Sequence, residues 1–84
     1  MRIDLDVSEL VPCEPLERIT EQLRRLETGS WLHVIHHQEP HPLYQLLAQG
    51  GFAWHTSPGG PAGYVILIWR KGDAPAECEA LKAA

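Results

Sequence analysis

Cysteine, positive charge and long apolar runs are all scarce in this 84-residue chain. Its two cysteines, Cys13 and Cys78, provide neither a disulfide framework nor a zinc-type pair, so any chemistry at Cys13 is that of a single thiol. Seven Lys and Arg against eleven Asp and Glu give a net charge of -4, which argues against a nucleic-acid partner. No apolar run approaches the length that spans a bilayer, so we expect no membrane partner.

The first residues, Met-Arg-Ile-Asp-Leu-Asp, are acidic where a signal peptide would be basic and then apolar. We therefore expect a cytoplasmic protein. A chain of this length has room for one small core. We place a single domain in residues 1–70 and expect residues 71–84 to form a polar C-terminal tail or a short last helix.

Apolar spacing predicts four strands and two main helices. Alternating apolar residues, or runs rich in β-branched and aromatic side chains, predict strands at residues 3–6, 31–36, 52–56 and 64–69. The first helix begins at Glu14-Pro15, because proline and acids favour a helix start, and it ends at Gly29. The second begins at Pro42 and ends at Gly50-Gly51. The buried face of the first helix is predicted from one apolar stripe: Leu16, Ile19, Leu23 and Leu26.

The order β-α-β-α-β-β predicts an α+β fold, a two-layer α/β sandwich. The first two strands are joined by a helical crossover and should be parallel, while the last two form an antiparallel hairpin. The result is a four-stranded mixed sheet with both main helices on one face. On the other face we expect Trp31, His33 and Ile35 to contribute to an exposed apolar patch, which would mark a dimer or partner surface.

This topology brings distant polar residues to one end of the sheet, where both helices begin. Helix N-termini carry partial positive charge and free backbone N–H groups, which bind anions and lower the pKa of a thiol. We expect this end to bind a ligand or a partner. Cys13 precedes the first helix, and the binding residues predicted at the two helix starts are Glu14, His36, His37, Glu39 and His41.

Two motifs resemble a known superfamily. L-D-V-x-x-L-x-P-x-E-P-L-E and H-x-x-E-P-x-P-L-Y-x-x-L resemble the TusA/SirA-like sulfur carriers, and more closely an uncharacterised bacterial branch of them, over roughly residues 3 to 70. The carriers hold a persulfide on the cysteine of a Cys-Pro-x-Pro motif. This chain has Pro12-Cys13-Glu14-Pro15, so proline takes the position of that cysteine. The resemblance implies a TusA-like accessory domain with a redox or sulfur-metabolism protein as its partner.

These residues suggest two alternative functions. They do not show whether the protein is a binding domain or an enzyme. The first is an accessory domain that binds a partner or small ligand at the helix starts. The alternative is a sulfur-relay protein, with Cys13 as the catalytic residue that carries the persulfide. Against the relay, Cys13 can equally be a small, half-buried residue in a connection.

The histidine-rich turn also has alternative interpretations. His36, His37 and His41 offer imidazole ligands for a transition metal, which is the one cofactor that the sequence suggests. Alternatively, Glu39 accepts hydrogen bonds from backbone N–H groups and fixes the turn, while His41 caps or flanks the second helix. Glu14 and Glu39 can form a general acid–base pair if the two turns meet, or each can simply favour a helix start. We expect a monomer or a weak homodimer.

Overall fold

The structure, a computed structural model, describes residues 1–8, 14–59 and 63–83, and describes Glu14 and Pro15 through their backbone alone. Within these ranges, no helix has both the length and the apolar character needed to cross a membrane. The described residues form six elements in the expected order, followed by a last helix. They are β1 (Arg2–Asp6), α1 (Glu14–Arg24), β2 (Trp31–His36), α2 (His41–Gly50), β3 (Phe52–Pro58), β4 (Tyr64–Arg70) and α3 (Ala74–Lys82).

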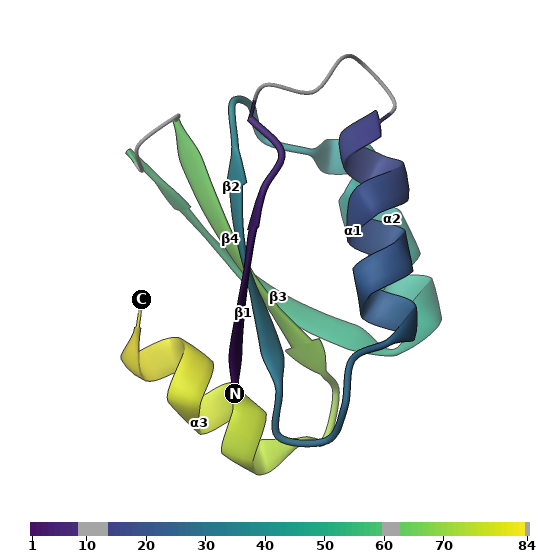
Figure 1. Cartoon of the computed structure of the whole chain (residues 1–84), viewed down its shortest axis with the longest axis vertical. Coiled ribbons are helices and arrows are strands. Elements are labelled where there is room, and N and C mark those ends of the chain that lie inside the picture. Colours follow the sequence, from purple (N-terminus) through teal and green to yellow (C-terminus); the bar gives the residue numbers. More distant parts are fainter. Residues whose placement is uncertain (9–13, 60–62, 84) are drawn as a thin grey trace.

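The four strands form one mixed sheet in the order β1-β2-β4-β3. β1 and β2 are parallel, as a helical crossover requires, and β4 is antiparallel to both of its neighbours. Both α1 and α2 lie on one face of this sheet (Figure 1). The predicted α+β sandwich, with a sheet layer and a helix layer, is confirmed.

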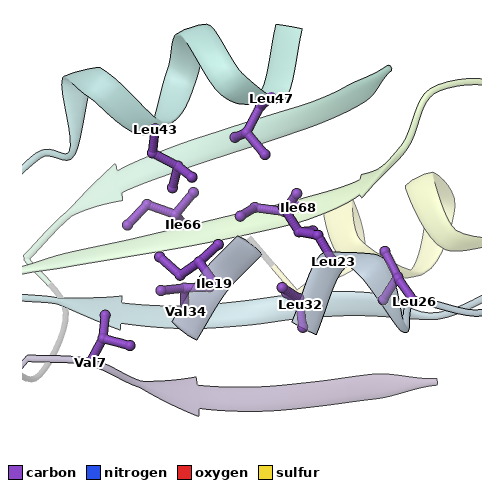
Figure 2. Packing of buried hydrophobic residues seen from close by; sticks show 10 residues of the cluster. All are labelled: Val7, Ile19, Leu23, Leu26, Leu32, Val34, Leu43, Leu47, Ile66 and Ile68. Atoms are coloured by element: carbon purple, nitrogen blue, oxygen red, sulfur yellow. The ribbon is translucent and has the colours of Figure 1, made fainter. Parts of the chain in front are cut away.

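The main core lies between the sheet and these two helices (Figure 2). Residues at alternate positions of each strand face the helices, because successive side chains of a strand point to opposite faces. The stripe predicted for α1 is confirmed, since Ile19 is fully buried and Leu16 packs against the cluster. The buried members of this core are Val7, Ile19, Leu23, Leu26, Leu32, Val34, Leu43, Leu47, Ile66 and Ile68.

The two main helices end differently. α1 ends at Arg24, earlier than the predicted Gly29, and the Arg70 guanidinium donates hydrogen bonds to the carbonyl oxygens of Leu26 at 3.0 Å and Leu23 at 3.4 Å. A strand side chain thus contacts carbonyl oxygens at the end of the helix, where the Leu23 carbonyl also accepts from the Leu26 N–H at 3.2 Å. α2 ends as predicted, with Gly51 in a left-handed conformation (φ 81) and its N–H bonded to the Leu47 carbonyl.

The C-terminal segment is the short helix rather than the loose tail. α3 packs on the sheet face opposite α1 and α2, where fully buried Ala76 and Ala80 lie in a second cluster with Trp31, Leu67 and Trp69. The exposed apolar patch expected around Trp31 was therefore wrong for that residue, which is only 2% exposed. Small alanine side chains let the helix backbone approach the indole rings, and this long-range packing has no local sequence signal.

Candidate functional site

Both main helices begin at the same end of the sheet. β1 and β2 are parallel, and α1 and α2 follow them, so the two helix starts lie at one rim (Figure 1). The arrangement on which the predicted site depends is confirmed. Cys13 and the side chain of Glu14 lie outside the described residues, so their contributions stay predictions. The described polar side chains there form what we call the helix-start rim: His36, Glu39, His41, Tyr44 and Thr56.

His36 is the buried member of the helix-start rim. It follows Leu32 and Val34 on the helix-covered face, beside Tyr64 of β4, and is 4% exposed. Its Nδ1 accepts a hydrogen bond from the Gln38 backbone N–H at 3.2 Å, which places the proton of the neutral ring on Nε2. Burial, followed by the neighbouring His37, lowers the pKa of His36.

The backbone of the turn after β2 lies close against the start of β4. Gly63 has a φ of 133, and a Cβ added there would lie 3.1 Å from the carbonyl oxygen of His37. Glycine is therefore required both for the conformation and for the close approach. The side chain of His37 is exposed, and its ring centroid lies 5.0 Å from that of His36.

The Glu39 carboxylate lies against the imidazole of His41, the first residue of α2. Glu39 Oε1 lies 3.1 Å from His41 Nε2, and the His41 side chain is 75% exposed. No backbone N–H of the described residues donates to this carboxylate, so that alternative has no support, whereas His41 flanks α2 at its first residue without capping it. The turn is instead fixed by its backbone, with the His41 N–H bonded to the Glu39 carbonyl at 3.1 Å.

The first three residues of α2 have no backbone N–H group free for a ligand, contrary to expectation. The N–H of His41 is bonded to the Glu39 carbonyl, and that of Leu43 is bonded to the Pro40 carbonyl at 3.0 Å. Pro42, between them, has no N–H. The polar side chains present at this helix start are the carboxylate of Glu39 and the exposed imidazole of His41.

Tyr44 extends the helix-start rim onto β3, and the sequence had not indicated this role. Its ring stacks on Trp54, with centroids 5.3 Å apart and an angle of 5° between planes, and the His41 ring meets it edge-on at 5.8 Å. Its hydroxyl lies 2.7 Å from that of Thr56, and either group can donate. Burial raises the pKa of Tyr44, the Thr56 bond opposes the shift, and the Glu39 carboxylate adds to it. The three-residue spacing from His41 was the available signal, since it places both side chains on one side of a helix.

The three histidines of this turn do not gather around one point. His36 lies beside His37, whereas His41 lies against Glu39. Among the side chains of residues 1–8, 16–59 and 63–83, no three of His, Cys, Asp and Glu are grouped so as to hold a metal ion. The metal site of His36, His37 and His41 has no support from this geometry and stays a prediction.

The buried imidazole of His36 predicts that stability falls in mild acid. Its folded-state pKa lies below the unfolded value of about 6.5, so the unfolded chain takes up protons first as pH falls. The stabilising contribution is complete above about pH 6.5 and is lost as pH falls from there toward the lower folded pKa. Burial also lowers the pKa of His33, helped by Arg2 and opposed by Asp4, so it acts in the same direction.

Urea unfolding at several pH values between neutral and mildly acidic checks this effect. We expect His36→Asn, which keeps an acceptor near the Nδ1 position, to show a shallower loss of unfolding free energy with falling pH than the wild type. His55→Asn, at an exposed histidine of β3, is the matched control and should keep the wild-type slope. Equal slopes for His36→Asn and the wild type would contradict the assignment to His36.

Comparison with known proteins gives one match. A model of the family described as "Uncharacterized conserved protein (DUF2249)" matches residues 4–70, which run from β1 to the last residue of β4 and leave α3 outside. No curated protein and no solved structure matches the chain. The resemblance to the TusA/SirA-like superfamily therefore stays a prediction.

Proposed function

The chain belongs to this family, and we propose that it is a small cytoplasmic accessory domain that binds a partner protein through the helix-start rim. The observation that supports this proposal is the Glu39–His41–Tyr44 group, which combines an acceptor, a donor and an aromatic surface at one end of the sheet. Such mixed groups provide orientation and specificity at a binding surface. The resemblance implies that the partner is a redox or sulfur-metabolism protein.

The group is held rigidly enough for recognition. Tyr44 is fixed by its stack on Trp54 and by the Thr56 hydroxyl, both on β3, so α2 and the sheet position it together. His41 is exposed while its ring is oriented by Glu39. A partner that presents both a donor and an acceptor would bind Glu39 and His41 in the positions that they already hold. The entropic cost of binding is then lower, because these side chains need not be ordered first.

Calorimetry with candidate redox and sulfur-metabolism proteins tests the proposal, with divalent metals and small anions as separate titrants. We expect Glu39→Ala and His41→Ala each to weaken binding by about tenfold or more, the loss typical of a central contact residue. His55→Ala, at an exposed histidine on the other face of β3, should bind like the wild type. Unchanged affinity in Glu39→Ala, or no binding by any titrant, would remove the proposal.

The sulfur-relay alternative depends on Cys13, which lies outside the described residues. What supports it is the start of α1 at Glu14, the next residue along the chain, since a helix start favours a thiolate. Loading from a cysteine desulfurase should then add the mass of one sulfur atom to the wild type and to Cys78→Ser, but not to Cys13→Ser. An unmodified wild type, under conditions that load a known carrier, would exclude the relay.

A further inference from the structure

An apolar groove runs between α1 and α2, on a surface separate from the helix-start rim. Leu46 of α2 lines it and is 44% exposed. Among the described large hydrophobic residues, only Met1 and Leu81 are more exposed. Thr20, Leu23, Leu43 and Phe52 also line it, and Arg24 and Arg70 lie beside them. None of the helix-start rim residues takes part. An exposed leucine in a groove of this kind indicates a contact surface.

Along the adjoining part of this surface, which Leu46 also lines, the acids of α1 come before the bases. Glu17 and Glu21 are followed by Arg24, the last residue of α1, and by Arg25 just beyond it. Arg25 is already paired with Glu21 at 3.0 Å, one helical turn away. Glu17 and Arg24 are exposed and belong to no ion pair of the described residues.

We propose that this face binds a second copy of the chain, with the two α1 helices antiparallel across a two-fold axis. An axis between Thr20 and Glu21 brings the Glu17 of each protomer to the partner's Arg24, twice in one interface. The same axis places Leu16 against the aliphatic part of the partner's Arg25. The residues between 16 and 25 that line the adjoining surface beside Leu46 are thereby matched in pairs: Leu16 with Arg25, Glu17 with Arg24, and Thr20 with Glu21.

Charge complementarity favours a second copy over an unrelated partner. A two-fold interface requires a surface that complements itself, because both protomers present the same residues. When two α1 helices lie antiparallel, the acids of each face the bases of the other, so this requirement is met. When they lie parallel, like charges would face each other. The chain carries a net charge of -4, so two copies repel on average, and a face with its own bases is where they can approach.

Charge reversal tests the pairing directly. Sedimentation of the wild type over a concentration series should show a monomer–dimer equilibrium that weakens with salt. Glu17→Arg and Arg24→Glu should each weaken self-association on the order of tenfold, since each sets like charges together at two contacts. An equimolar mixture of the two variants should dimerise as the wild type does, because every contact then joins an acid to a base.

Recovery in the mixture separates a direct contact from damage to the fold, and circular dichroism of each variant provides an independent check. Leu46→Glu should abolish the dimer, whereas Leu81→Glu, at an equally exposed leucine of α3, should leave it intact. A wild type that stays monomeric at the highest concentration overturns the proposal and assigns the groove to another occupant. Weakening that the mixture does not reverse also overturns it. Neither result affects binding at the helix-start rim.

Discussion

Replacing Trp31 with alanine is expected to cost about 3–5 kcal/mol of unfolding free energy, the loss typical of a large aromatic residue removed from a core. Trp31 is 2% exposed and packs between the sheet and α3. A domain of this length has a total stability of roughly 4–13 kcal/mol, so the substitution removes a large fraction of it. Urea unfolding followed by far-ultraviolet circular dichroism measures the effect.

Trp31→Phe provides the contrast. The indole Nε1–H is buried without a hydrogen-bond partner among the described residues, and an unpaired buried donor is itself destabilising by about 1–3 kcal/mol. Phenylalanine keeps most of the ring volume and removes this donor, so we expect a change below about 1.5 kcal/mol. If Trp31→Ala lowered the unfolding free energy as little as substitution of an exposed residue does, α3 would not cover the sheet face opposite α1 and α2.

Asp73→Ala is expected to cost about 2–4 kcal/mol. One carboxylate oxygen accepts from the Ala76 N–H at 3.3 Å and caps α3, and the other accepts from the Gly29 N–H at 2.7 Å. Losing the cap costs about 1 kcal/mol. Leaving the partly buried Gly29 N–H unpaired costs about 1–3 kcal/mol more. Asp73 is thus the residue that joins α3 to the connection before β2, and thermal or urea unfolding of the variant measures both bonds.

Asp73→Asn and Asp73→Ser divide this cost between the two bonds. Serine can cap the helix but has one oxygen, so it should recover only the capping part. Asparagine keeps one acceptor oxygen, so Asp73→Asn should also recover only part of the stability that Asp73→Ala loses. Amide hydrogen exchange at Gly29 should accelerate in Asp73→Ala, because its N–H then lacks an acceptor. Unchanged exchange at Gly29 would show that the bond to Asp73 does not form in solution.

The fold could be predicted from the sequence where the signal is local. Alternating and helical apolar spacing gave the four strands and α1, and Pro42 with Gly51 defined α2. The parallel pair β1–β2 and the β3–β4 hairpin also followed, because a helical crossover requires parallel strands and a short connection favours a hairpin. The sequence did not indicate that β4 pairs with β2 and so lies inside the sheet. The position of α3 could not be predicted, because Ala76 and Ala80 form no apolar stripe that identifies a buried helix face. Their burial depends in part on the indole ring of Trp31, more than forty residues away along the chain.

The candidate site shows the same division. The common start of α1 and α2 follows from topology, and the pairing of Glu39 with His41 lies within one turn. The contact of Tyr44 with Thr56 depends on how α2 packs on β3, which no local pattern encodes. The closed backbone bonds at the start of α2 were also missed. They depend on the turn geometry around Pro40 and Pro42 rather than on residue type.

The central claim is that the helix-start rim binds a partner, and chemical-shift mapping of the isotope-labelled protein tests it most directly. Addition of a partner that binds in calorimetry should shift the amide signals of Gln38, His41, Tyr44 and Thr56 and leave those of α3 in place. The same titration of Glu39→Ala should give smaller shifts at every added concentration. Shifts confined to the α1–α2 groove or to α3, with the helix-start rim unchanged, would contradict the account.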